Sequence, residues 1–247
     1  MSFTVTVLGC AGMFATRERA ASGYLLQIAD ANVWLDAGPG TWRNLLGYID
    51  YADLDAVVLT HHHPDHTSDV FMAYHARVYG QRDPLPKVPL LAPRETIDRL
   101  RAFADLDEAF EVTAVAAGEK RELAGAAFSF HRMAHPGETL GVRVEYGGGV
   151  FAYSADTGPD GELDALTKDA NVFICEATFQ EGDEGWEGHM LAGQAAQIAS
   201  RNGVMHLVLT HLPPSRDLGL SLQQAHTDAE GVRIELADDG RRYEVIG

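Results

Sequence analysis

Short apolar runs, separated by glycine, proline and polar residues, follow one another along the first half of the chain. Their length and their content of β-branched and aromatic residues are typical of strands. Five such runs occur before position 93: FTVTVLG (3–9), GYLLQIA (23–29), NVWLDAG (32–38), DAVVLT (55–60) and PLLA (89–92). Three stretches with helical patterning lie between or after them: TWRNLLGYI (41–49), SDVFMAYHARVYG (68–80) and PRETIDRLRAFA (93–104).

The second half repeats this plan of apolar strands and intervening helices. Its strand-like runs are AFSFHRMAH (127–135), LGVRVEY (140–146), GVFAYSA (149–155), NVFICEA (171–177), MHLVLTH (205–211), VRIEL (232–236) and RYEVI (242–246). Helices are predicted at GHMLAGQAAQIASRNG (188–203) and SLQQAHTDAE (221–230). The three glycines at 147–149 predict a hairpin turn. Two β-rich halves without a linker favour one α/β domain spanning residues 1–247.

The overall composition is that of an ordinary globular protein, with 46% hydrophobic and 22% charged residues. The first residues do not resemble a secretory signal, and no apolar run approaches the roughly 20 residues that a membrane helix needs. Cys10 and Cys175 lie far apart and outside any CxxC spacing. We therefore expect a cytoplasmic enzyme or binding protein with no disulfide framework and no contact with the membrane.

The charge balance is strongly acidic. The chain has 19 Lys and Arg residues against 36 Asp and Glu residues, a formal net charge of −17, and no basic run. Proteins that grip long nucleic acids need clustered cations to displace phosphate counterions, so no long nucleic-acid partner is expected. A small anion is still compatible with this composition, because bound divalent cations can reverse the local charge of a site.

One segment, LTHHHPDHTSD at 59–69, carries an unusual concentration of metal-binding side chains. It begins where a buried strand is predicted to end. Alternate residues of an extended segment point the same way, so His61 and His63 can face one point, while Asp65 and His66, after the turn at Pro64, can face a second. Imidazole with carboxylate suits zinc or a similar divalent ion. The alternative is a solvated, histidine-rich surface loop.

Three further residues follow apolar strands in the same way. His135 comes after AFSFHRMA, Asp156 after GVFAYSA and His211 after MHLVLT. Each one could be a structural residue when it is considered singly. Together with the first cluster, they supply the larger ligand set that a two-metal site requires.

This set of residues resembles the metallo-β-lactamase superfamily along nearly the whole chain. The resemblance implies an α/β fold, the αββα four-layer sandwich, with two divalent metal ions, zinc or alternatively manganese, at its edge. It implies seven ligands: His61, His63 and His135 for one ion, Asp65, His66 and His211 for the other, and Asp156 bridging both. The bridging position holds Asp156 and not the cysteine of antibiotic-degrading members, which argues against β-lactam hydrolysis.

Two elements resemble ribonuclease Z within this superfamily: CEATF at 175–179 and GHMLAGQAA at 188–196. In that family the residues matching Glu176 and His189 form a proton-donating pair. Displacement of an alkoxide from phosphorus is slow unless the departing oxygen is protonated or bound to metal, so such an acid has a clear use. The alternative is that Glu176 merely ends a strand and His189 merely opens a helix.

The chain departs from ribonuclease Z in one respect. The long basic arm that clamps tRNA is expected between His135 and Asp156, but the 20 residues there are used by a predicted hairpin. The pattern is more similar to small bacterial cyclic-nucleotide phosphodiesterases, which resemble the chain at TVLGCAG…ASGYLL, YSADTG, FICEATF and LTHLPP.

These comparisons of motifs predict a phosphodiesterase acting on small phosphodiesters, with cyclic nucleotides favoured. In the expected mechanism a hydroxide shared by two ions about 3.5–4 Å apart attacks phosphorus. Asp65 orients it, and His189, oriented and kept cationic by Glu176, protonates the leaving oxygen. The alternatives are a ribonuclease Z-like tRNA 3′ endonuclease, a lactonase or thioesterase, and a metal-binding regulatory protein without turnover. Because superfamily members are often homodimers, we also expect a homodimer.

Three weaker signals concern the surroundings of this site. His62 should point away from His61 and His63 by alternation. Gly9 and Gly12, in the LGCAG segment, predict a tight turn and a close approach of the backbone near the metals. The acidic loop 179–190 could be a lid whose Trp186 stacks on a planar group, or simply a solvated surface loop.

Overall fold

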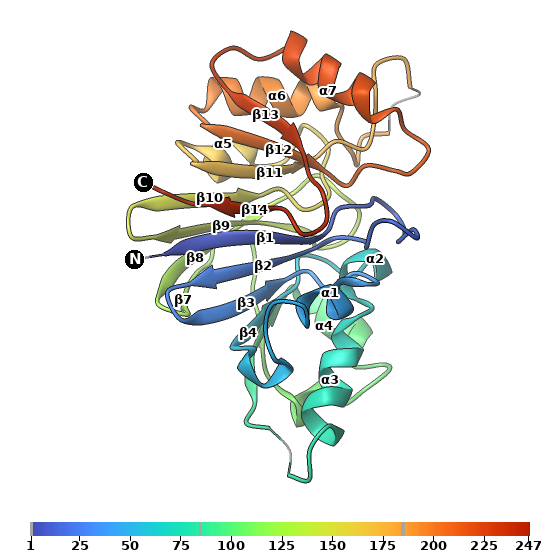
Figure 1. Cartoon of the computed structure of the whole chain (residues 1–247), viewed down its shortest axis with the longest axis vertical. Helices are drawn as coiled ribbons and strands as arrows, with labels where there is room; N and C mark the ends of the chain where they lie inside the picture. Colours follow the sequence, from blue (N-terminus) through green and yellow to red (C-terminus); the bar gives the residue numbers. More distant parts are fainter. Residues whose placement is uncertain (1, 84, 184–185) are drawn as a thin grey trace.

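The computed structural model describes residues 2–83, 85–183 and 186–247. These residues form two seven-stranded β-sheets that pack face to face, with helices on both outer faces (Figure 1). This arrangement confirms the αββα four-layer sandwich that the resemblance implied.

Each sheet combines antiparallel and parallel strand pairs. In spatial order the first sheet consists of β14 (Arg242–Glu244), β1 (Phe3–Gly9), β2 (Gly23–Ile28), β3 (Ala31–Leu35), β4 (Ala56–Val58), β5 (Val88–Ala92) and β6 (Phe110–Ala114). The second consists of β13 (Arg233–Leu236), β12 (His206–Thr210), β11 (Val172–Glu176), β10 (Gly149–Tyr153), β9 (Leu140–Tyr146), β8 (Ala126–Arg132) and β7 (Lys120–Leu123).

The helices divide between the two outer faces (Figure 1). On the first sheet and its edge lie α1 (Thr41–Leu45), α2 (Pro64–Thr67), α3 (Val70–Tyr79) and α4 (Arg94–Leu100). The second sheet is covered by α5 (Leu163–Thr167), α6 (Ala192–Arg201) and α7 (Leu218–Thr227). Short 3₁₀ turns occur at Tyr51–Asp53 and Leu106–Glu108. None of the helices in the described part of the chain reaches the length and hydrophobicity that crossing a bilayer requires.

The nearly continuous apolar character of the strands follows from burial on both faces. In β1, Val5 and Val7 point into the core between the sheets, whereas Leu8 points into the core under α1, α3 and α4. In β10, Phe151 lies in the core between the sheets and Ala152 lies under the helices of the second sheet. Side chains alternate between the two faces of a strand, so a strand in a middle layer is apolar at most positions, with Thr4 and Thr6 of β1 as buried polar exceptions.

Two strands, β6 and β7, were not predicted. They lie at the far ends of their sheets, and their side chains alternate between buried or half-buried and exposed positions. An edge strand that is covered on one face needs only every second residue to be apolar, so the sequence of β7, KREL, lacks the apolar run used to find the others. Several predicted helices are also shorter in the structure, for example α6 at Ala192–Arg201 against 188–203.

The predicted hairpin at 147–149 is confirmed. Strands β9 and β10 pair antiparallel, from Gly149 opposite Tyr146 to Tyr153 opposite Val142. Gly147 and Gly148 have φ values of 57° and 89°, the left-handed geometry that a two-residue hairpin turn requires. The segment between His135 and Asp156 is therefore occupied by a loop and a compact hairpin.

The strand directions bring one set of strand ends to a common edge. Strands β3 and β4 run parallel in the first sheet, and β10, β11 and β12 run parallel in the second. Strand β8 has the same direction as β10, because each pairs antiparallel with β9. In sandwiches with parallel strands, the loops after these strand ends are where functional side chains meet.

Candidate metal centre

The seven predicted ligands lie together at this edge, although they come from distant parts of the chain. Three groups of side chains among the described residues have potential ligand atoms within 4.8 Å of one another; two consist of the predicted ligands, and the third is Glu176, His189 and His211. The first group is His61, His63, His135 and Asp156, and the second group is Asp65, His66, Asp156 and His211. Only Asp156 belongs to both groups, which is the position that the resemblance gives to a bridging ligand.

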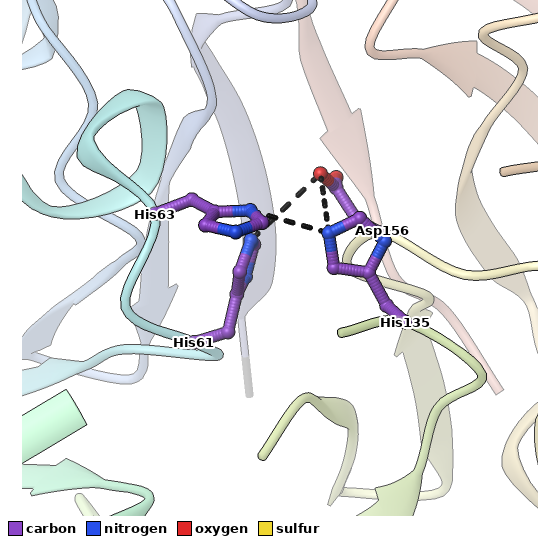
Figure 2. A group of neighbouring side chains, drawn as sticks. All are labelled: His61, His63, His135 and Asp156. Carbon is purple, nitrogen blue, oxygen red and sulfur yellow. Dashed lines mark hydrogen bonds and ion pairs between the residues drawn. The ribbon is translucent and has the colours of Figure 1, made fainter. Parts of the chain in front are cut away.

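In the first group, side chains from opposite sides of the site converge (Figure 2). Nε2 of His61 and Nε2 of His135 each lie 3.8 Å from Oδ2 of Asp156. Nδ1 of His63 lies 3.2 Å from Nε2 of His135. His61 and His63 follow β4, whereas His135 and Asp156 follow β8 and β10, so this group joins the two sheets.

The second group uses the other oxygen of the shared carboxylate. Oδ1 of Asp156 lies 3.2 Å from Nε2 of His66 and 3.4 Å from Nε2 of His211. Nε2 of His211 is also 3.3 Å from Oδ2 of Asp65. Each oxygen of Asp156 therefore faces a different group of imidazole nitrogens, as a bridging carboxylate would.

Asp36 organises the back of the second group. Its Oδ2 accepts a hydrogen bond from Nδ1 of His66 at 2.7 Å, from the Thr60 hydroxyl at 2.9 Å and from the Tyr153 hydroxyl at 3.1 Å. Because the Thr60 hydroxyl donates to Asp36, Nδ1 of His61, 3.1 Å from the same hydroxyl, must donate to Thr60. Both His61 and His66 thus have their proton on Nδ1.

Two of the three other imidazoles, those of His135 and His211, are oriented in the same way. Nδ1 of His135 donates to the carbonyl of Gly188 at 2.8 Å. Nδ1 of His211 donates to the Thr178 hydroxyl at 2.9 Å, which itself donates to the His211 carbonyl. Such hydrogen bonds to Nδ1 set the tautomer of metal-binding histidines.

This orientation turns four Nε2 lone pairs toward the carboxylate of Asp156. Lone pairs facing carboxylate oxygens repel each other unless a cation or a proton lies between them. Nε2 of His61, Nε2 of His66 and Oδ1 of Asp156 are buried and have no hydrogen-bond partner among the described residues. Buried polar atoms without partners are costly, and imidazole with carboxylate suits divalent cations. The residues therefore fit metal ions.

Charge and burial separate the two groups. Burial lowers the pKa of His61, His63 and His135 below the usual value. Burial also acts to lower the pKa of His66, but Asp156, Asp36 and Asp65 raise it well above the usual value. For His211, too, burial is outweighed, mainly by Asp156, and its pKa is raised.

The backbone around the site adopts conformations that are uncommon for residues with a side chain. Asp36, Ala155 and His211 have φ values of 57°, 54° and 54°. Left-handed conformations of such residues cluster at functional sites, where the surroundings hold them. A Cβ on Gly12 would lie 2.5 Å from the His211 carbonyl oxygen, which confirms the predicted close approach of this loop.

Glu176 and His189 form a hydrogen-bonded pair beside both groups. Nδ1 of His189 lies 2.7 Å from Oε1 of Glu176, whose carboxylate also accepts hydrogen bonds from the backbone of Thr157, Thr178 and Met190. The His189 ring stacks on that of His211 with centroids 5.3 Å apart. It also lies 5.0 Å from the His135 ring. The pair thus lies beside both groups of candidate ligands, and His189 precedes α6, which begins at Ala192.

The weaker predictions have mixed outcomes. His62 belongs to neither group, and its Nδ1 lies 3.8 Å from Oε1 of Glu95, as its predicted direction requires. The Trp186 ring lies 5.2 Å from that of His189 and 5.6 Å from that of His135, and the residue is 48% exposed. Residues 184–185 of the predicted lid lie outside the described residues, so the lid stays a prediction.

The sequence reasoning missed Asp36, Thr178 and Tyr153, which support the candidate ligands from behind. Asp36 could have been found by the criterion used for the ligands, because it directly follows the apolar strand NVWL. Thr178 and Tyr153 carry no comparable signal, since a single hydroxyl near a strand end is common.

The chain is similar in sequence to a known family and to known proteins. The family described as "Beta-lactamase superfamily domain" matches residues 31–212. The probable metallo-hydrolase YhfI of Bacillus subtilis is 32% identical over 213 residues, covering 85% of this chain and 86% of that protein. A ribonuclease Z of Kineococcus radiotolerans is 29% identical over 293 aligned positions, covering 95% of this chain and 93% of that protein.

Solved structures give the same fold. The crystal structure of YhfI superposes with a TM-score of 0.90 at 27% identity and covers 98% of both chains. A diphosphatase of the PhnP family superposes with a TM-score of 0.79 at 22% identity, covering 99% of this chain and 98% of that one.

Proposed function

The chain belongs to the beta-lactamase superfamily and is similar to metal-dependent hydrolases, and we propose that it hydrolyses small phosphodiesters, with cyclic nucleotides favoured. Each of the two His/Asp groups would hold one divalent cation, with Asp156 shared between them. Zinc is the preferred ion because imidazole nitrogens predominate, and manganese is the alternative. When bound, such ions polarise phosphoryl oxygens and lower the pKa of a water molecule.

The observation that carries this proposal is the Glu176–His189 pair. An alkoxide leaving phosphorus needs a proton, and His189 adjoins both His135 and His211. The Glu176 carboxylate holds Nδ1 of His189, so the opposite nitrogen of the ring is free to deliver a proton. Asp65, within 3.3 Å of His211, is both a candidate ligand and an acceptor that can orient the attacking water.

The size of the substrate is argued from charge and topology. With a net charge of −17, the chain lacks the basic surface expected for a tRNA substrate. The segment between His135 and Asp156 folds as a loop and the β9–β10 hairpin. The similarity to a ribonuclease Z nevertheless makes tRNA 3′ processing the second candidate, so a tRNA precursor belongs among the substrates tested.

The leaving group gives a sharp test of the proposed acid. We expect H189A to lower kcat/KM for cyclic AMP, whose leaving group is a poor alkoxide, by about 10²–10⁴-fold. The same variant should lose much less activity on bis(p-nitrophenyl) phosphate, because p-nitrophenolate departs without a proton. Metal content, measured by mass spectrometry, should be unchanged in this variant.

His75 provides a matched control, because it is an exposed histidine on α3 outside both groups. H75A should retain both activities. Equal losses of H189A on the two substrates would contradict the role of His189 as acid. Turnover of a lactone or thioester without any turnover of phosphodiesters would contradict the proposed function itself, and rapid tRNA cleavage would contradict the argument from size.

A further inference from the structure

A cavity of about 680 Å³ opens directly beside the first metal group. His63, a candidate ligand, forms part of its wall together with His62 and Pro64. His63 is therefore common to the cavity wall and to the first group. The functions predicted from the sequence do not include a role for this cavity.

Two aromatic rings contribute to the apolar part of the cavity wall, together with Leu100 and Ala102. Phe71 of α3 and Phe103, just beyond α4, contact each other edge to face, with centroids 5.9 Å apart. Phe103 is 82% exposed, whereas Phe128 and Phe130 of the core are almost completely buried. A large apolar ring left in water beside a catalytic centre indicates a surface that a ligand covers.

Most hydrogen-bond donors around the cavity are engaged with neighbouring residues. The Thr67 hydroxyl donates to the His63 carbonyl at 3.0 Å, and the Ser68 hydroxyl donates to the Pro64 carbonyl at 2.7 Å. Arg99 is paired with Glu95, through Nη2 at 2.7 Å and Nε at 3.1 Å, whereas Nδ1 of His62 has no hydrogen-bond partner among the described residues. The aromatic and aliphatic side chains of the wall therefore offer an uncharged planar ring more contact surface than they offer a phosphate or a carboxylate.

A second cavity, of about 440 Å³, adjoins His135 on another side of the centre. Its wall includes Met133, Arg132 and Glu138, and none of the described residues lining it is aromatic apart from His135 itself. Stacking of a flat ring is therefore available beside His63 and is absent from the second cavity.

We propose that the cavity between Phe71 and Phe103 is a subsite for the aromatic ring of the phosphodiester, a nucleobase in a nucleotide substrate. The proposal rests on the proposed function, because the phosphate of the same molecule is placed at the metal groups. Phe103 and Phe71 would then be determinants of specificity, with the exposed Phe103 ring stacking on the base.

Two substrates with the same leaving group test this subsite. Thymidine 5′-(p-nitrophenyl) phosphate carries a base and methyl p-nitrophenyl phosphate does not, while both release p-nitrophenolate. We expect the ratio of kcat/KM for the two substrates, base over methyl, to fall about tenfold in F103A, mainly through KM, as loss of one base–aromatic stack implies. F103W should restore the ratio, and F103L should not.

Met72 offers a matched control on the same helix, because it is 47% exposed and outside the cavity wall. M72A should leave the ratio unchanged. An unchanged ratio in F103A would overturn the subsite. A wild-type ratio in F103L would contradict the proposal that the ring of Phe103 stacks on the base.

A binding measurement separates this proposal from the proposed function. If neither phosphodiester is hydrolysed, the proposed function fails. The subsite is then tested separately by measuring the binding of adenosine with saturation-transfer NMR. Binding by the wild type that is lost in F103A and kept in M72A supports the subsite. Absence of binding, or binding unaffected by F103A, overturns it.

Discussion

The two halves of the candidate metal centre, the first and the second group, share one carboxylate but differ in the hydrogen bonds and charges around their imidazoles. In the first group His61 and His135 donate from Nδ1 to neutral oxygens, of Thr60 and of the Gly188 carbonyl. In the second group, His66 donates to the carboxylate of Asp36. The second group also contains Asp65 in addition to the shared Asp156. The first half is therefore a set of neutral imidazoles around one carboxylate, and the second half is rich in negative charge.

This difference affects the protonation of the imidazoles in each half of the metal-free protein. The carboxylates raise the pKa of His66 and His211, so the second half of the metal-free protein keeps its protons up to a higher pH than free imidazole does. Burial lowers the pKa of His61 and His135, so the first half loses its protons at a lower pH. We expect the first half to bind zinc with little competition from protons, and the second half to exchange protons for a cation and to accept oxygen-preferring ions such as manganese more readily.

Asp156 is the one ligand common to both halves, so its removal should have the largest effect. We expect D156N to lower the metal content at both positions and to lower kcat/KM for phosphodiesters by about a thousandfold or more, since a catalytic metal supplies several kcal/mol. Elemental analysis and steady-state kinetics measure the two effects. A variant that kept two ions per chain would show that Asp156 does not bridge them.

Substitution of Asp36 should weaken metal binding in the second half only. Asn tolerates the left-handed backbone of this position but removes the charge behind His66, so D36N should weaken metal binding at the second half about 10–100-fold. Competitive titration with a chelating dye measures the two affinities separately. D69N is the control, because it makes the same chemical change at a carboxylate that accepts its hydrogen bonds from the backbone of Gly40 and Trp42 and not from a candidate ligand. Equal weakening of both halves in D36N would refute the distinction.

Acidification of the wild-type protein should weaken metal binding in the second half more than in the first. Below the raised pKa of His66 and His211 each of these imidazoles holds a proton that the metal must displace, so binding at the second half should weaken about tenfold per pH unit for each proton displaced. The lowered pKa of His61 and His135 makes binding at the first half nearly independent of pH in the same range. Zinc titrations between about pH 6 and 8 measure both slopes. Parallel slopes would contradict the assigned charges.

The smallest expected effect concerns the hydroxyl behind His211. T178V removes the acceptor for Nδ1 of His211 with little change in shape, and a hydrogen bond of this kind is worth about 0.5–1.5 kcal/mol. We therefore expect the affinity of the second half to fall a few-fold, up to about tenfold, with the first half unaffected. T227V, on α7, is the matched control. A loss of metal affinity at the first half would contradict the assignment of Thr178 to the second half.

Much of the architecture is readable from the chain because strand patterning and strand-end chemistry are local properties. Strands buried on both faces are apolar at most positions, so β1, β4, β10 and β11 stand out in the sequence. The edge strands β6 and β7 do not, because one of their faces is exposed. The histidine and aspartate side chains after apolar runs identify candidate ligands for the same local reason, although their division into two groups rested on a family resemblance.

The partnerships within the site depend on which strands become neighbours, and local sequence does not encode this. Asp36 and His66 are 30 residues apart in sequence, Tyr153 and Asp36 are 117 apart, and His211 and Asp65 are 146 apart. Sheet order and the packing of one sheet on the other bring them into contact. The sequence by itself therefore determined the strands and the kinds of ligand, whereas the tertiary structure decided which carboxylate is shared, which imidazoles have charged partners, and where a cavity opens beside them.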